Sequence, residues 1–251
     1  MKIGGLQKLT LIDFPSKIAC GVFLAGCNFR CPFCYNPYLV IPTKIKTQPK
    51  ISEKNFFNFL KKRKNFLEAV VITGGEPTIQ KDLSKFIKEI KKLGYLIKLD
   101  TNGYRPEILK RLIKENLIDY IAMDIKAPLN KKIQSLKNKN QNNKRIFNKD
   151  YEKMAISKID LKKIKESIEL IKNSEIEYEF RTTIIPIFHT KTDIIQIAKE
   201  ISPAKRYFLQ NFNPKNTLNP KFQQIKPYFD EYLLKIQKEI NHFFEICQIR
   251  F

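Results

Sequence analysis

The sequence predicts an α/β fold in which parallel strands form an open, partial (β/α)6 barrel. Short runs rich in Val, Ile, Phe and Tyr alternate along the chain with segments of helical period. This alternation gives parallel strands joined by right-handed crossovers. Six such units are fewer than the eight that close a (β/α) barrel, so we expect a sheet that is open on one side.

Six runs have the length and composition of strands, and each ends in or next to Gly or Pro. They are "IACGVFLAG" (18–26), "AVVITGGEP" (69–77), "YLIKLDTNG" (95–103), "YIAMDIKAP" (120–128), "EYEFRTTIIP" (177–186) and "RYFLQNFNP" (206–214). The closing segment "EICQIRF" (245–251) is a candidate for one further short strand.

Segments of helical period separate these runs. The expected helices cover residues 52–66, 81–94, 106–117, about 160–174, 191–201 and 227–244. Ser52 is a candidate N-cap, Gly94 is placed to end its helix, and Pro106 suits the first turn of the next one.

We expect a single domain over residues 1–251, because no Gly-, Ser- or Pro-rich linker divides the chain. A polar, Lys- and Asn-dense segment at about 130–158 breaks the alternation and is expected to be a loop insertion. The longest apolar stretch, residues 18–26, is too short to cross a bilayer, and the N-terminus lacks the apolar segment of a signal peptide. These features predict a cytoplasmic protein without a membrane partner.

The formal net charge of +22 requires that a nucleic-acid partner be considered. The lysines, however, are spread over expected helix faces and one loop, in a chain that is also rich in Asn and Ile. Net charge alone governs solubility and nonspecific binding. Nucleic acid is therefore not the expected substrate.

Polar residues collect where the expected strands end. The loops at the carboxyl ends of parallel strands build the functional site in such folds, and polar groups inside β runs are costly to bury without partners. The strand ends carry the cysteine loop, Gly74-Gly75-Glu76-Pro77, Asp100-Thr101-Asn102-Gly103, Asp124 with Lys126, Arg181 with Thr183, and Gln210 with Asn211. Their recurrence points to one shared pocket.

The stretch "CNFRCPFCY" (27–35) places three cysteines in a C-x3-C-x2-C pattern. In a cytosolic chain this pattern favours metal or redox chemistry over disulfides. A structural zinc site needs a fourth ligand, for which the candidates are Cys20, His189, His242 and Cys247. One alternative is therefore a nucleic-acid-binding protein stabilised by a structural zinc ion. Cys20 and Cys247 fit better as small core residues. A cubane iron–sulfur cluster held by three thiolates would leave one iron open to an external ligand.

These residues resemble the radical S-adenosylmethionine (radical SAM) superfamily. The resemblance rests on Cys27, Cys31, Phe33 and Cys34, followed by GGEP at 74–77. It implies a [4Fe-4S] cluster ligated by the three cysteines, with S-adenosylmethionine on the open iron. One-electron reduction would then cleave the sulfonium and give a 5′-deoxyadenosyl radical.

The chain further resembles the glycyl-radical-enzyme activating proteins, and among them the type that activates anaerobic ribonucleoside-triphosphate reductase. "LIDFP" (11–15), "DTNG" (100–103) and "DIKAP" (124–128) select this group. Such activases take a hydrogen atom from a glycine of a partner enzyme. This chain departs from the family at Tyr35, where relatives usually have His.

The resemblance assigns roles to the strand-end residues. Gly74, Gly75 and Glu76 would approach the methionine amino group, and Phe33 would lie near the adenine. Asp100, Thr101 and Asp124 would bind a monovalent cation, which suits their oxygen ligands. Lys126 is expected to neutralise the methionine carboxylate, and Arg181 to contact the cofactor or the substrate peptide. Gln210 is expected to contact the cofactor only because of its position at a strand end.

The resemblance implies a protein substrate and a flavodoxin or ferredoxin as electron donor. Two alternatives stay open within radical SAM chemistry. One is an activase whose partner is of the pyruvate formate-lyase type. The other is an enzyme acting on a small molecule, similar to the carboxy-deazaguanine synthases.

Overall fold

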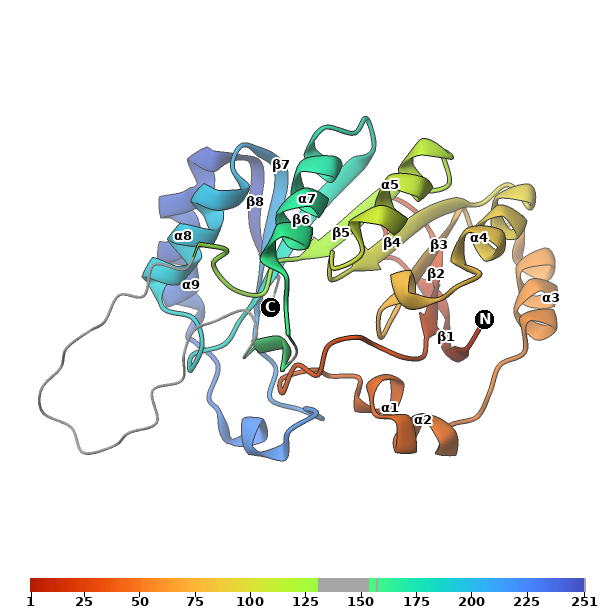
Figure 1. The fold of residues 1–251 in the computed structure, drawn as a ribbon, viewed down its shortest axis with the longest axis horizontal. Coiled ribbons are helices and arrows are strands. Elements are labelled where there is room, and N and C mark those ends of the chain that lie inside the picture. The colour runs from red at the N-terminus through yellow and green to blue at the C-terminus, as the bar shows by residue number, and fades with distance from the viewer. Residues whose placement is uncertain (131–153, 157, 251) are drawn as a thin grey trace, which may run out of the picture.

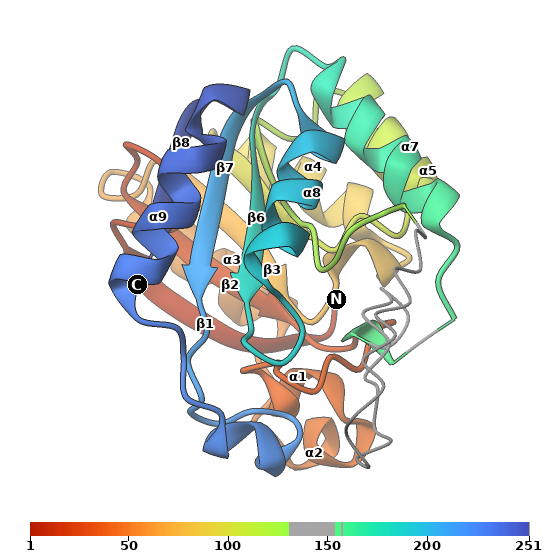
Figure 2. The ribbon, with the colours of Figure 1, turned by 90° about the vertical axis from the view of Figure 1, so that its left-hand side faces the viewer.

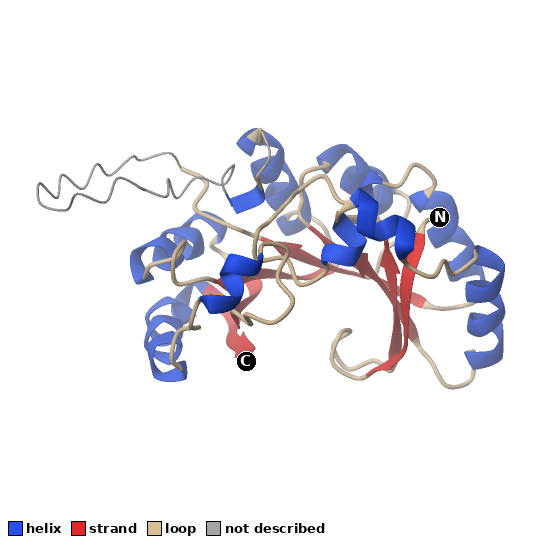
Figure 3. Cartoon of the chain, turned by 90° about the horizontal axis from the view of Figure 1, so that it is seen from below, coloured by secondary structure: helices blue, strands red, loops and turns tan. Residues whose placement is uncertain are grey.

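The computed structural model describes residues 1–130, 154–156 and 158–250. These residues form one eight-stranded sheet, and its strands lie side by side in chain order from β1 to β8. β1 pairs antiparallel with β2, and every later neighbouring pair is parallel. The sheet curves into an arch with helices along its outer side, as Figures 1 and 3 show. The expected open α/β sheet of parallel strands is confirmed.

The elements alternate as follows along the chain. They are β1 (Ile3–Thr10), β2 (Ala19–Leu24), α1 (Pro37–Val40), α2 (Pro42–Thr47), α3 (Glu53–Arg63), β3 (Ala69–Gly74), α4 (Leu83–Lys92), β4 (Leu96–Thr101), α5 (Pro106–Lys114), β5 (Tyr120–Asp124), α7 (Leu161–Lys172), β6 (Glu177–Ile184), α8 (Lys191–Ile201), β7 (Ala204–Asn211), α9 (Asp230–Ile240) and β8 (Phe244–Arg250).

The helix boundaries follow local chemistry. Ser52 caps α3, since its Oγ accepts a hydrogen bond from the Asn55 amide at 3.1 Å. Gly94 has a positive φ of +84°, which a residue with a side chain rarely adopts, and it follows the end of α4. Thr190 and the carboxylate of Asp193 form a reciprocal capping box that starts α8. Among the described helices, none is long and apolar enough to cross a bilayer.

All six expected strands are present, and each ends earlier than predicted. β3 ends at Gly74, because the amides of Gly75 and Glu76 donate to the Leu24 and Gly26 carbonyls at the start of the cysteine loop, and β5 ends at Asp124. The closing segment forms β8, as the sequence suggested. β1 was not predicted: its two glycines and alternating polar residues give a weak strand pattern. The polar insertion expected at about 130–158 lies mostly outside the described residues.

The two faces of the sheet are buried differently. Helices cover the outer face, and the main core lies between them and the sheet. On the inner face, a small cluster closes the amino-terminal end of the arch: Phe14, Ala19, Ala69, Val71 and Tyr120. Phe14 comes from the "LIDFP" loop after β1, and its ring centroid lies 5.7 Å from that of Tyr120. The loop therefore plugs this end of the arch.

Charged side chains fill the inner face beside this plug. Glu179 of β6 is fully buried, and Arg250 of β8 binds its carboxylate with two hydrogen bonds of 2.9 Å each. Lys98 of β4 is 2% exposed and lies 3.7 Å from the same carboxylate. Tyr120 donates a further hydrogen bond to Glu179 at 3.0 Å. Burial opposes ionisation of Glu179, but Arg250, Lys98 and Arg181 hold its pKa below the usual value.

Glu179→Gln should therefore destabilise the fold strongly, because it leaves buried cations without their counter-charge. We expect a loss of about 3–5 kcal/mol in the free energy of unfolding, measured by urea denaturation at neutral pH. Since the folded-state pKa of Glu179 is lowered, its contribution is present above the unfolded-state pKa and is lost as pH falls through the folded-state value.

Glu177→Gln is the matched control, two residues earlier on β6. Glu177 pairs with Lys205 at 2.7 Å, but its side chain is 46% exposed, so we expect a loss of at most about 1 kcal/mol. Equal losses in the two variants would contradict the role assigned to the buried network.

Candidate active site at the carboxyl edge of the sheet

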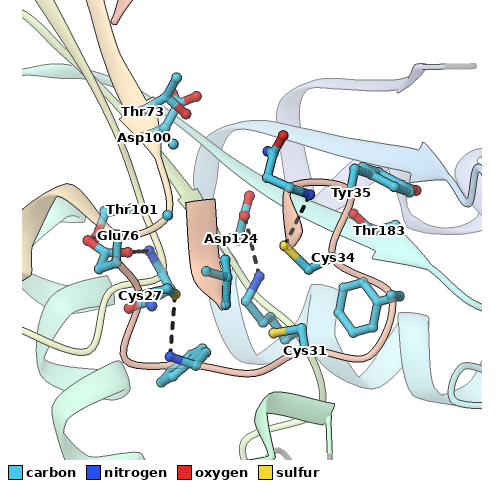
Figure 4. A pocket seen from close by; sticks show the side chains of 18 of the residues that line it. Cys27, Cys31, Cys34, Tyr35, Thr73, Glu76, Asp100, Thr101, Asp124 and Thr183 are labelled. Atoms are coloured by element: carbon cyan, nitrogen blue, oxygen red, sulfur yellow. Dashed lines mark hydrogen bonds and ion pairs between the residues drawn. The ribbon is translucent and has the colours of Figure 1, made fainter. Parts of the chain in front are cut away.

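A cavity of about 250 Å³ lies at the carboxyl ends of the parallel strands. It is lined by the cysteine loop and by residues that end β3, β4, β5, β6 and β7 (Figure 4). The structure brings together in this lining every residue for which the sequence analysis expected a cluster or cofactor contact: Cys27, Cys31, Phe33, Cys34, Gly74, Gly75, Glu76, Asp100, Thr101, Asp124, Lys126, Arg181 and Gln210. Of the other strand-end residues, Asn211 lies outside the lining, and its side chain donates to the Tyr228 carbonyl at 2.9 Å. Their individual roles stay predictions.

The three thiols lie on the loop that connects β2 to α1. The Phe29 amide donates a hydrogen bond to Cys27 Sγ at 3.3 Å, and the Asn36 amide donates one to Cys34 Sγ at 3.4 Å. Backbone donors of this kind stabilise a thiolate and tune a cluster that it ligates. Burial raises the pKa of Cys27 to about 12 and that of Cys31 to about 11, so metal binding must displace their protons.

Neighbouring segments hold the cysteine loop on both sides. On one side the Arg30 amide donates to the Ala155 carbonyl at 2.7 Å. On the other side two amides of the segment after β7, Leu218 and Asn219, donate to the carbonyls of Cys34 and Pro32, each at 2.9 Å. These contacts fix the loop from outside the cavity.

Tyr35, the position that departs from the family pattern, belongs to the same outer support. Its hydroxyl accepts a hydrogen bond from the Asn213 amide at 2.8 Å, and its ring lies nearly parallel to that of Phe212 at 6.4 Å. The side chain is 40% exposed, at the rim of the cavity. Tyr35, which directly follows Cys34, therefore links the end of the cysteine loop to the segment that follows β7.

The Gly74-Gly75 turn packs directly against the backbone of Leu24 and Gly26, where β2 ends and the cysteine loop begins. A Cβ on Gly75 would lie 2.0 Å from the Gly26 carbonyl oxygen, and Gly74 has a φ of +120°. The sequence analysis explained these glycines by approach to the cofactor. The structure adds a second reason, because only glycine lets the end of β3 touch the start of the cysteine loop.

Glu76 is 1% exposed and accepts hydrogen bonds along two neighbouring strand ends. Its carboxylate receives the Thr78 hydroxyl at 2.6 Å, the Thr101 hydroxyl at 2.8 Å and the Asn102 amide at 2.7 Å. Burial raises the pKa of Glu76 although these donors act in the opposite direction. The side chain thus joins the ends of β3 and β4, which is a positioning role beside the predicted cofactor contact.

Arg181 lies between two carboxylates of the cavity wall. Its Nε donates to Asp124 Oδ1 at 2.9 Å, and its guanidinium lies 3.5 Å from Asp100 Oδ2. Lys126 Nζ lies 3.4 Å from the other oxygen of Asp124 and 5.9 Å from the Phe33 ring centroid. Burial opposes ionisation of Asp124, but Arg181 and Lys126 hold its pKa below the usual value.

Two features of this site were missed from the sequence. The first is the buried network of Lys98, Glu179 and Arg250 beneath Arg181. The sequence did contain a sign of this network. Lys98 and Asp100 on β4, and Glu179 and Arg181 on β6, alternate with apolar residues, so each charged pair lies on one face of its strand. The second is the supporting role of His189, which the sequence analysis considered only as a candidate zinc ligand. His189 precedes α8, is 1% exposed, and its Nε2 lies 3.0 Å from the Lys126 carbonyl oxygen.

The donor set fits an iron–sulfur cluster better than a structural zinc ion. His189 accepts the Ile185 amide on Nδ1 and contacts Lys126 through Nε2, while Cys20 and Cys247 are buried in the core. In the described part of the chain, no group of three His, Cys, Asp or Glu side chains converges as a single metal ion requires. A cubane cluster spreads its thiolates over separate irons. The cavity also offers a buried Asp100 oxygen without a hydrogen-bond donor.

Comparison with known sequences agrees with this geometry. Residues 22–201 match the profile of the "Radical SAM superfamily". The chain is 32% identical over 252 residues to a Methanocaldococcus jannaschii protein named "Putative glycyl-radical enzyme activating enzyme MJ1227", covering 99% of this chain and 95% of that one. It is also 32% identical to the pyruvate formate-lyase-activating enzyme of Listeria monocytogenes, over 50% of this chain and 53% of the relative.

Solved structures share the fold at low sequence identity. The S-adenosylmethionine-bound structure of Streptococcus suis SuiB superposes with a TM-score of 0.59 at 13% identity, covering 90% of this chain and 51% of SuiB. Escherichia coli QueE superposes with a TM-score of 0.52 at 14% identity, covering 99% of this chain and 94% of QueE. At these identities the likeness concerns the fold alone.

Replacing Cys27, Cys31 or Cys34 with Ala should remove the cluster, because each thiolate would hold its own iron. After anaerobic reconstitution we expect a loss of most bound iron and sulfide and no cleavage of S-adenosylmethionine. Cys20→Ala and Cys247→Ala are the controls, and they should cost only stability, on the order of 1 kcal/mol. Full iron content in any of the first three variants, or its loss in a control, would show that the ligands are misassigned.

Proposed function

The chain belongs to the radical SAM superfamily and to its glycyl-radical-enzyme activating enzymes, and we propose that its partner is an anaerobic ribonucleoside-triphosphate reductase in the cytoplasm. Its cofactors are a [4Fe-4S] cluster and S-adenosylmethionine. One observation supports the proposal most directly. Three thiols on one loop share a cavity with paired acidic and basic side chains, in a chain that resembles an activating enzyme over nearly its full length.

The cofactors supply the radical that abstracts a hydrogen atom from a glycine Cα when both are bound. The protein's own contribution is to bind, orient and shield. Lys126 and Arg181 provide positive charge for the methionine carboxylate, while Asp124 keeps both cations in place. Phe33 is 6% exposed and gives an apolar wall on the cysteine side, which suits the adenine ring.

The support around these groups keeps the site rigid. Glu76 holds two strand ends together, and His189 contacts the backbone of Lys126 through a buried ring nitrogen. Catalytic groups whose positions are fixed in this way lose little entropy on binding. A partner peptide would reach the cavity from the open side of the arch, between the two edge strands β1 and β8.

The motifs "LIDFP", "DTNG" and "DIKAP" favour this activase group over the wider radical SAM superfamily. They hardly separate the reductase from a pyruvate formate-lyase-type partner, which would require the same chemistry, and we propose the reductase because the chain most resembles activases of that type. A small-molecule substrate is the less favoured alternative, since similarity to QueE extends to the fold alone. A flavodoxin or ferredoxin is the electron donor that we propose. Nucleic acid is not proposed as the substrate, because positive charge alone governs solubility and nonspecific binding.

A monovalent cation bound by Asp100, Thr101 and Asp124 is also part of the proposal. Both carboxylates already contact Arg181, so the cation would share them with the guanidinium. We expect the Kd for S-adenosylmethionine to rise severalfold when Na⁺ and K⁺ are replaced by tetramethylammonium, which is too large for the site. Isothermal titration of the cluster-loaded protein measures this. An unchanged Kd would assign the neutralising role to Arg181 alone.

The activase function has a specific spectroscopic test. Anaerobic protein, reductant and S-adenosylmethionine should produce a glycyl doublet in the electron paramagnetic resonance spectrum only when the reductase is present. A reductase whose radical glycine is replaced by Ala is the control and should give no doublet. If no candidate partner yields the doublet while a small molecule consumes S-adenosylmethionine stoichiometrically, the activase proposal is wrong.

A further inference from the structure

The acidic residues of this chain are unevenly distributed. The two longest stretches without Asp or Glu are residues 14–52 and 201–229. The first contains the cysteine loop with α1 and α2, and the second contains β7 and the segment leading to α9. Both stretches contain lysines, so all their charged side chains are positive.

The structure brings the loop parts of these stretches together around the cysteine loop. Residues 36–52 leave the loop on one side. Residues 212–229 lie against its other side, where the Leu218 amide donates to the Cys34 carbonyl and the Asn213 amide to the Tyr35 hydroxyl. Both arms lie at the carboxyl edge of the sheet, at the bottom of Figures 1 and 2.

The exposed lysines of these two arms form what we call the basic rim: Lys46, Lys50, Lys215, Lys221 and Lys226. Neither arm contains a carboxylate that could neutralise them, whereas lysines elsewhere pair with acids, as Lys88 does with Glu115 at 2.8 Å. Two exposed aromatic side chains accompany the rim. Tyr35 is 40% exposed and directly follows Cys34, and Tyr38 is 52% exposed. Exposed aromatic residues are enriched in protein-binding surfaces, and a surface of uncompensated positive charge attracts an acidic partner.

We propose that the basic rim is the docking surface for an acidic one-electron carrier protein. The inference rests on the proposed function, which needs one electron delivered to the cluster. The carrier is oxidised by one electron and the cluster is reduced by one, so no proton or further reactant is required. Opposite charge at the rim steers the carrier to the outer side of the cysteine loop, where Tyr35 lies next to a cluster ligand.

The position of the rim favours a carrier over the partner enzyme. The glycine of a partner must reach the cavity inside the arch, because the cavity is where Asp124, Lys126 and Arg181 gather. A carrier needs only to approach the cysteine loop from outside. The loop contacts made by Leu218 and Asn219 place the rim on that outer side.

Charge reversal on each arm tests this surface. The variants are Lys46→Glu/Lys50→Glu and Lys215→Glu/Lys221→Glu. The control is Lys110→Glu/Lys162→Glu, which makes the same charge change at exposed positions of α5 and α7. The first readout is the Kd for oxidised flavodoxin, an acidic carrier used as probe, from flavin fluorescence at low and high salt. The second is cleavage of S-adenosylmethionine, driven either by reduced flavodoxin or by photoreduced deazariboflavin, a small uncharged reductant.

Each rim variant should raise the Kd for flavodoxin by about tenfold at low salt, while the control changes it little. The difference should shrink at high salt, because screening weakens interactions between exposed charges. Cleavage driven by deazariboflavin should be unchanged in all variants.

The surface assignment is wrong if flavodoxin binds the rim variants as tightly as the wild type. It is equally wrong if those variants instead weaken binding of the partner enzyme or of single-stranded DNA while carrier binding stays the same. If the wild-type protein does not cleave S-adenosylmethionine when photoreduced deazariboflavin is the reductant, the proposed function is contradicted, and not the assignment of the basic rim.

Discussion

The rest of the site depends on the hydrogen bonds of the buried residue Glu76. Its carboxylate accepts hydrogen bonds from Thr101 and Asn102 at the end of β4, and its backbone amide donates to the Gly26 carbonyl at 2.8 Å. Asn102 in turn donates to Asn28 at 2.9 Å. Glu76 thus connects the ends of β3 and β4 through its carboxylate, and its backbone amide and Asn102 connect them to the cysteine loop. Together with the outer contacts made by Ala155, Leu218 and Asn219, these hydrogen bonds fix the cysteine loop relative to the charged half of the cavity.

Charge is divided sharply between the inside and the outside of the arch. Inside, on strands β4, β5, β6 and β8, Asp100, Asp124 and Glu179 are matched by Lys98, Arg181 and Arg250. Such buried pairs cost desolvation, and they persist where geometry and hydrogen bonding are good. Outside, around the cysteine loop, lysines have no carboxylates nearby in the sequence. The inner pairs suit a zwitterionic cofactor, while the outer excess of positive charge suits an acidic protein.

Much of this arrangement could be predicted from residue patterns. Parallel strands bring their carboxyl ends to one edge, so polar residues at Gly74 to Glu76, Asp100 and Asp124 were expected to meet, and they do line one cavity. Strand β1 escaped prediction because its pattern is weak. The buried Lys98 and Glu179 escaped because they lie in the middle of their strands, away from the strand ends where functional polar groups gather. His189 escaped because a contact between its ring and the Lys126 backbone depends on how two loops pack. No local pattern encodes such a contact.

The central claim is that three thiolates leave one iron open for the methionine end of S-adenosylmethionine. Electron–nuclear double resonance of the reduced protein, with S-adenosylmethionine labelled with ¹⁵N at its amino group, tests the claim directly. Our account predicts a ¹⁵N hyperfine coupling to the cluster, because the amino nitrogen would bind the open iron. A bound, labelled cofactor without such coupling, on a fully loaded cluster, would contradict it.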